Sequence, residues 1–122
     1  MQKKDNLILQ KSYDFSLMVI ELYKFLCESK KEYVLSKQLL RAGTSVGANV
    51  NEAQAGMSKK DFVAKMSIAS KEARETKYWL NLLADSGYIS KADDKVRNLF
   101  EEIERIISIL TKIVKTGASN EK

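Results

Sequence analysis

Proline is absent from all 122 residues of this chain, and apolar residues recur at a helical period in four consecutive stretches between Leu7 and Val114. In the last stretch they lie three or four positions apart, so a helix would place them on one stripe. We therefore predict an all-α fold, an antiparallel up-down four-helix bundle. The stripe of the last stretch contains Val96, Leu99, Phe100, Ile103, Ile106, Ile107, Leu110, Ile113 and Val114.

Capping and turn residues set the expected limits of the four helices. Ser58 precedes Asp61 by three positions and Ser90 precedes Asp93 in the same way, which is the spacing of a capping box with Asp in place of Glu or Gln. Gly117 marks the expected end of the last helix. The predicted helices span residues 7–29, 33–55, 59–86 and 91–115, and residues 116–122 are predicted to form a disordered tail.

Two glycines, Gly43 and Gly47, lie inside the predicted second helix. Each glycine in a helix interior costs roughly 0.5–1 kcal/mol relative to alanine. Their spacing of one turn therefore predicts that another helix backbone passes close to this face. The alternative is a kink, or a break into two shorter helices near Gly47.

The composition, with 44% hydrophobic and 30% charged residues, is ordinary for a globular protein, and the length predicts one domain. No apolar run approaches the roughly 18 residues of a membrane span, and the first residues lack the apolar core of a signal peptide. We therefore expect a cytoplasmic protein without membrane association.

Catalytic chemistry finds little support in the residues. Cys27 is the single cysteine and histidine is absent, which excludes an internal disulfide, histidine-based zinc sites and Ser-His or Cys-His nucleophiles. Di-iron bundles need Glu-x-x-His pairs, and the glycine patterns of nucleotide-binding loops are missing. We expect a protein that is not an enzyme and that needs no metal or cofactor.

Two helices carry more apolar surface than a lone bundle needs. The predicted first helix has a second apolar stripe with Leu9, Tyr13 and Ile20, beside the stripe that faces the core. The predicted third helix has a mixed flank. We predict that both surfaces lie between subunits of a homo-oligomer. The alternatives are that the first helix is simply the best buried of the four, and that Trp79 covers the edge of the monomer core. The mixed flank contains Ile68, Glu72 and Trp79.

The formal net charge is +5, and part of the basic excess falls on one face of the predicted third helix. Lys60, Ser67, Lys71, Arg74 and Tyr78 lie within about 60° of one another there, a set that we name the basic strip. Its cations could neutralise phosphates while Tyr78 offers a plane for base stacking. A solvated helix face has the same appearance, but copies of a weak strip in one oligomer would bind a polyanion more tightly.

The stretch from Leu35 to Gly56 and the stretch from Phe62 to Leu83 resemble the 23S ribosomal RNA intervening-sequence protein family. The most specific part is the pattern R-A-x-x-S-[VI]-[GP]-A-N-[VI]-x-E, which begins at Arg41, and Gly47 stands where many relatives have proline. The positions that match the family pattern include Arg41, Ser45, Asn49 and Glu52, with Glu75, Trp79 and Leu80 farther along the chain.

The resemblance implies a small bacterial four-helix bundle with no established catalytic activity. It also implies a ring of five subunits, and a likeness to the accessory protein of diversity-generating retroelements, which associates with nucleic acid and a reverse transcriptase. We accordingly predict a homo-oligomer that binds nucleic acid, RNA before DNA, through the basic strip. The alternative is a scaffold that engages another protein and binds no nucleic acid.

Overall fold

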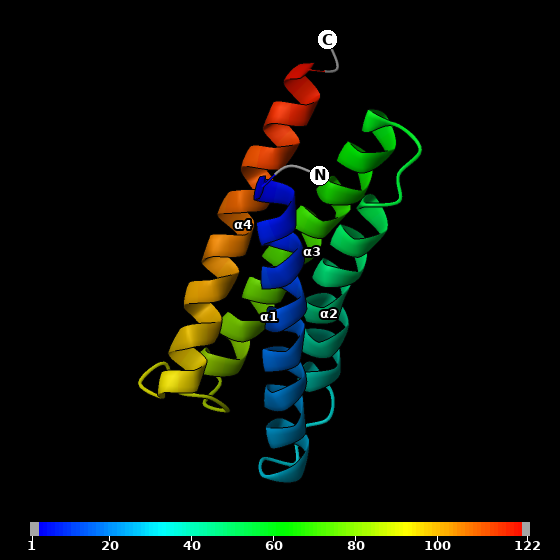
Figure 1. Ribbon diagram of the computed structural model, residues 1–122. Helices are drawn as coiled ribbons and strands as arrows, with labels where there is room; N and C mark the ends of the chain where they lie inside the picture. The colour runs from blue at the N-terminus through cyan, green and yellow to red at the C-terminus, as the bar shows by residue number, and fades with distance from the viewer. Residues whose placement is uncertain (1–2, 121–122) are drawn as a thin grey trace.

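The computed structural model describes the backbone of residues 3–120 and the side chains of residues 7–117. Each helix runs opposite to the one before it, so the predicted up-down bundle is confirmed (Figure 1). No helix in the described part is both long enough and apolar enough to cross a membrane. The helices are α1 (Lys3–Glu28), α2 (Leu35–Ala53), α3 (Lys59–Asp85) and α4 (Asp94–Asn120).

The helices form a ring in which α1 packs on α2 and α4, and α3 packs on the same two neighbours. One apolar core lies between them, and every helix contributes fully buried side chains such as Phe15, Leu39, Leu80 and Ile106. The predicted stripe of α4 faces this core, although three of its members, Phe100, Ile107 and Val114, are only half-buried. Each fully buried apolar side chain contributes about 1.5–3 kcal/mol to stability. Because this contribution is large, the period of the apolar residues predicts which face of each helix is turned to the core.

The glycines of α2 allow α1 to approach closely, as predicted. A Cβ atom at Gly43 would lie 2.8 Å from Cγ2 of Val19, and one at Gly47 would lie 3.1 Å from the backbone oxygen of Ser12. Carbon atoms normally stay about 3.5–4.0 Å apart. The alternative of a break into two shorter helices is wrong, because α2 is continuous from Leu35 to Ala53.

Polar side chains cap three helices. Ser58 accepts a hydrogen bond from the Asp61 amide at 3.1 Å, as predicted for α3. The cap of α4 is Asp93 instead of Ser90, because its carboxylate accepts from the amides of Lys95 and Val96. The helix therefore begins at Asp94, three residues after the predicted start.

The cap of α2 is the buried carboxylate of Glu32, which the sequence analysis missed. It accepts hydrogen bonds of 2.7–3.1 Å from the amides of Val34, Leu35 and Ser36. Burial by itself raises the pKa of this carboxyl, but the three amide donors outweigh that effect and hold the pKa below its ordinary value. Because this cap ends the turn before α2, the helix begins two residues after the predicted start.

The far end of the chain differs from the prediction of a disordered tail. Helix α4 continues to Asn120, so residues 116–120 are helical, while residues 121 and 122 lie outside the described part. Gly117 is buried, and a Cβ atom there would clash with Cγ2 of Val63 on α3. This glycine allows close packing against α3, and it does not end the helix.

Candidate nucleic-acid interface

The basic strip lies on the outer surface of α3, as its helical spacing predicts. Lys60, Ser67, Lys71, Arg74 and Tyr78 are all exposed. Most of the exposed surface of a helix is solvated, so the strip needs further support before it counts as a binding surface. That support comes from α4, which packs beside α3.

A hydrogen bond between the two helices sets their register at the strip. The Arg74 guanidinium donates to Oγ1 of Thr111 at 2.9 Å. The helices are antiparallel, so three residues back along α3 and four residues forward along α4 are steps in the same direction. Lys71 and Lys115 therefore lie toward the same end of the helix pair, with exposed Lys112 beside Lys115 on α4.

This end of the helix pair is depleted in negative charge. The sequence contains no acidic residue from 62 to 71 on α3 and none from 105 to 120 on α4. The surface therefore carries a local excess of positive charge that the modest net charge of +5 does not reveal. We name the five cations of this end the basic end: Lys60, Lys71, Arg74, Lys112 and Lys115.

The cations of the basic end are free of ionic partners among the residues whose side chains are described, whereas many other cations are paired. Lys65 pairs with Glu52 across the α2–α3 boundary, and Lys77 pairs with Glu104 of α4 at 2.6 Å. An unpaired, exposed cation keeps its charge available for a phosphate, while a paired one must first give up its carboxylate. All five cations of the basic end are therefore available to a phosphate, as are several lysines elsewhere on the surface such as Lys24 and Lys37. The other paired cations are Lys11, Arg41, Lys95, Arg97 and Arg105.

Tyr78 contributes an aromatic ring to the basic strip. Its side chain is 56% exposed, and its ring meets the Trp79 ring edge to face with centroids 5.2 Å apart. The Trp79 indole is held by a 2.9 Å hydrogen bond from Nε1 to Oε2 of Glu75. Tyr78 therefore presents an open ring beside cations, which is the combination used for stacking single-stranded bases.

The residues of the family motif make contacts within one chain. Arg41 of α2 reaches across to α3, where it bonds Glu72 at 3.3 Å and also contacts Glu75. Asn49 donates to the backbone oxygen and the hydroxyl of Ser45. The Arg41 contacts and the pair of Glu52 and Lys65 join α2 to α3, whereas Asn49 bonds within α2, so the motif has an internal structural role that its spacing alone did not indicate.

The predicted subunit contacts flank α2 on both sides. Tyr13 is 63% exposed, whereas Leu9 and Ile20 are half-buried. The alternative that α1 is simply the best-buried helix is wrong, because Leu17 on the same helix is also 52% exposed. Serine and glycine contacts place this flank of α1 beside α2, since Ser16 lies next to Gly47.

On the other side of α2, Ile68 is 42% exposed, and Glu72 and Trp79 are half-buried. Trp79 packs against the edge of the core, as the alternative for this residue describes. The two flanks and the outer surface of α2 form one continuous side of the bundle, which we name the α2 side. A contact between subunits through the α2 side stays a prediction.

Sequence reasoning missed the two lysines of α4 that complete the basic end, Lys112 and Lys115. Each lies on a helix whose net charge is close to neutral, so helix-by-helix counting hides them. The signal that could have found them is the run of sixteen residues, from Arg105 to Asn120, without a carboxylate. Among the described residues there is no group of three or more potential metal ligands.

Comparison with known proteins adds two findings. A family model described as 23S rRNA-intervening sequence protein matches residues 4–112. The fold is similar to the crystal structure of a protein with unknown function from the S23 ribosomal protein family of Bacteroides thetaiotaomicron VPI-5482. That chain is 44% identical, the match covers 92% of this chain and 98% of that one, and the TM-score is 0.87. No protein with a curated description matches.

Proposed function

This chain belongs to the 23S rRNA-intervening sequence protein family, and we propose that it is a non-enzymatic, homo-oligomeric bundle that binds RNA through the basic end of α3 and α4. The observation that carries the proposal is the group of five exposed cations without ionic partners among the described residues. They lie on two adjacent helices, and three of them, Lys71, Lys112 and Lys115, lie in segments that lack carboxylates. RNA is preferred over DNA because Tyr78 offers a ring for unpaired bases, which RNA loops display. We expect such a protein to act in the cytoplasm.

The energy of binding should come mainly from phosphate neutralisation. Each phosphate contact on a single strand contributes about 0.7 to the slope of log affinity against log salt. If all five cations of the basic end contact phosphates, the slope is about −3.5 for one copy of the chain. Several copies in one oligomer would steepen the slope and raise the affinity, because a long strand can contact more than one basic end.

The first experiment measures the binding of a labelled single-stranded RNA by fluorescence anisotropy over a series of salt concentrations, with DNA of the same sequence alongside. The variant with Lys71→Glu and Arg74→Glu should lose most of its affinity and about 1.4 of the slope. The matched control changes Lys24 and Lys37 to Glu, because both lysines are exposed, have no ion pair with a described side chain and belong to α1 and α2. It alters the net charge equally and should bind almost as the original protein does.

Three results of this experiment would contradict the proposal. One is the absence of RNA binding at low salt. Another is binding that ignores salt, which would remove the phosphate mechanism. The third is an equal loss in the control variant, which would mean that only the overall charge matters. An oligomer that binds neither RNA nor DNA would favour the protein-interaction scaffold.

The second experiment tests assembly through the α2 side by light scattering at micromolar concentration. The protein should have a mass several times 13.8 kDa, and resemblance to relatives suggests five copies. Tyr13→Asp combined with Ile68→Asp should reduce the mass to that of one chain, because buried unpaired carboxylates are costly in an interface. Both side chains are exposed in the single chain, so its helical content should not change. A monomeric starting protein would refute this part of the proposal.

A further inference from the structure

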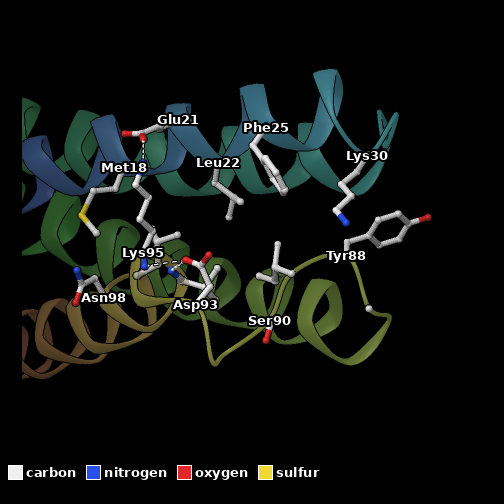
Figure 2. Close-up of a pocket in the computed structure, with 14 residues that line it drawn as sticks. Met18, Glu21, Leu22, Phe25, Lys30, Tyr88, Ser90, Asp93, Lys95 and Asn98 are labelled. Carbon is white, nitrogen blue, oxygen red and sulfur yellow. Dashed lines mark hydrogen bonds and ion pairs between the residues drawn. The ribbon is translucent and has the colours of Figure 1, made fainter.

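A groove opens between the C-terminal half of α1 and the segment that leads from α3 into α4 (Figure 2). Its volume is about 650 Å³, which lies within the range of sites for small ligands. The groove exists because α1 and α4 are the least closely packed of the neighbouring helix pairs. It lies between α1 and α4, apart from the α2 side, and none of its lining residues belongs to the basic end.

The floor of the groove is apolar. Leu22, Ile89, Val96 and Leu99 line it, and each keeps 3–8% of its surface exposed. Many other core side chains, such as Leu39, have no exposed surface at all. Phe25 stands at the rim and is 44% exposed. Apolar surface that remains open to water in a concave site favours an apolar ligand that can cover it.

Most of the charges around the groove are already neutralised. Glu21 and Lys95 pair at 2.8 Å across one end of the groove, as Figure 2 shows. This pairing lowers the pKa of Glu21 and raises that of Lys95, so both remain charged at neutral pH. The Asp93 carboxylate is occupied by the backbone amides that begin α4.

Lys30 is the exception among the charged lining residues. Its ammonium group lies at the other end of the groove, beside Tyr88, and no described carboxylate pairs with it (Figure 2). It lies 5.8 Å from the centre of the Phe25 ring, an exposed cation–π contact that leaves the charge available. The groove therefore combines an apolar floor with a single uncompensated positive charge at one end.

We propose that this groove binds a small carboxylate with an apolar body, whose carboxylate pairs with Lys30 while its body covers Leu22, Ile89 and Val96. A cationic ligand would meet Lys30 unfavourably, and a neutral one would forgo the ion pair. Binding here does not depend on RNA binding or on assembly, because none of the residues of those surfaces is shared.

The test uses three probes with the same apolar chain: octanoate, octanol and octylammonium. The uniformly ¹⁵N-labelled protein is titrated with each probe and the backbone amide signals are followed. Octanoate should bind saturably and shift the signal of Gly87, the one glycine that lines the groove. Octanol should bind about threefold to fivefold more weakly, since an ion pair with an exposed lysine is partly screened by water. Octylammonium should bind most weakly.

Two variants distinguish the contribution of the ion pair with Lys30 from that of the apolar contacts. Lys30→Gln should weaken octanoate about threefold to fivefold and leave octanol unchanged, whereas Phe25→Ala should weaken both probes. Lys24→Gln, outside the groove on α1, removes the same single charge as the matched control and should change neither. Helical circular dichroism checks that each variant is folded. The inference is overturned if octanoate does not saturate, if its affinity equals that of octanol, or if Lys30→Gln has no effect.

Discussion

Replacing Gly43 with alanine tests the closest contact between α1 and α2. The new Cβ atom would lie 2.8 Å from Cγ2 and 2.9 Å from Cγ1 of Val19. Both methyl groups are closer than carbon atoms tolerate, and Val19 is fully buried with a side chain that has essentially one rotamer in a helix. Rotation of Val19 therefore cannot relieve the contact, and the two helices must move apart.

Two opposing effects set the magnitude for Gly43→Ala. Overpacking in a core costs about 1–3 kcal/mol. Alanine gains about 0.5–1 kcal/mol over glycine in a helix interior. We expect a net loss of about 1 kcal/mol, or a fall of about 3–5 °C in Tm for a domain of this size. Urea and thermal unfolding, followed by circular dichroism at one fixed protein concentration, would measure it.

The same substitution in a protein that already carries Val19→Ala should have the opposite effect on stability. In a protein with Val19→Ala the clashing methyl groups are gone, so Gly43→Ala should then stabilise by about 0.5–1 kcal/mol. Ala48→Gly, at an exposed position of the same helix, calibrates the propensity and should cost about 0.5–1 kcal/mol. Stabilisation by Gly43→Ala in the original protein, or the same effect in both backgrounds, would refute the close approach of α1 and α2.

Three further predictions concern single contacts. Glu32→Gln should lower the free energy of unfolding by roughly 1–2 kcal/mol at neutral pH. Because the pKa of Glu32 is lower in the folded state, its stabilising effect is present above about pH 4.5 and is lost as the pH falls through the folded pKa. The unfolding curves of the two proteins should therefore converge in acid. Gly117→Ala should push α4 away from Val63, which would speed hydrogen exchange in the last turns of α4 while Tm changes little. Arg41→Ala should cost less than about 1 kcal/mol in urea unfolding, since its pairs with Glu72 and Glu75 are partly solvated; a larger loss would show that the motif arginine does more than join α2 to α3.

The candidate site was only partly readable from the sequence. The basic strip follows from positions on one helix, because residues such as Lys71 and Arg74 share a face by spacing alone. The contribution of α4 does not, since no local pattern states which turn of one helix lies beside which turn of another. The hydrogen bond between Arg74 and Thr111 fixes that register, and the register places Lys115 in the basic end.

Local signals also misled at both ends of α4. Ser90 and Asp93 have the spacing of a cap, but the helix uses the second residue because its carboxylate reaches two amides. Gly117 resembles a helix end, but α4 continues past it to Asn120, and the glycine instead leaves room for Val63 of α3. In both cases the residue type was read correctly as special, while its purpose depended on a neighbour distant in sequence or on the exact turn geometry.

The sequence by itself determined the helical class, the number of helices and the face that each turns toward the core. These follow from the period of the apolar residues, because apolar side chains are buried away from water and a helix of fixed pitch places residues three or four positions apart on one face. Only the tertiary structure decided the close approach at Gly43, the joining of two helices into one basic end, and the groove between α1 and α4. Those features depend on distances between side chains far apart in the chain, which a periodic pattern does not contain.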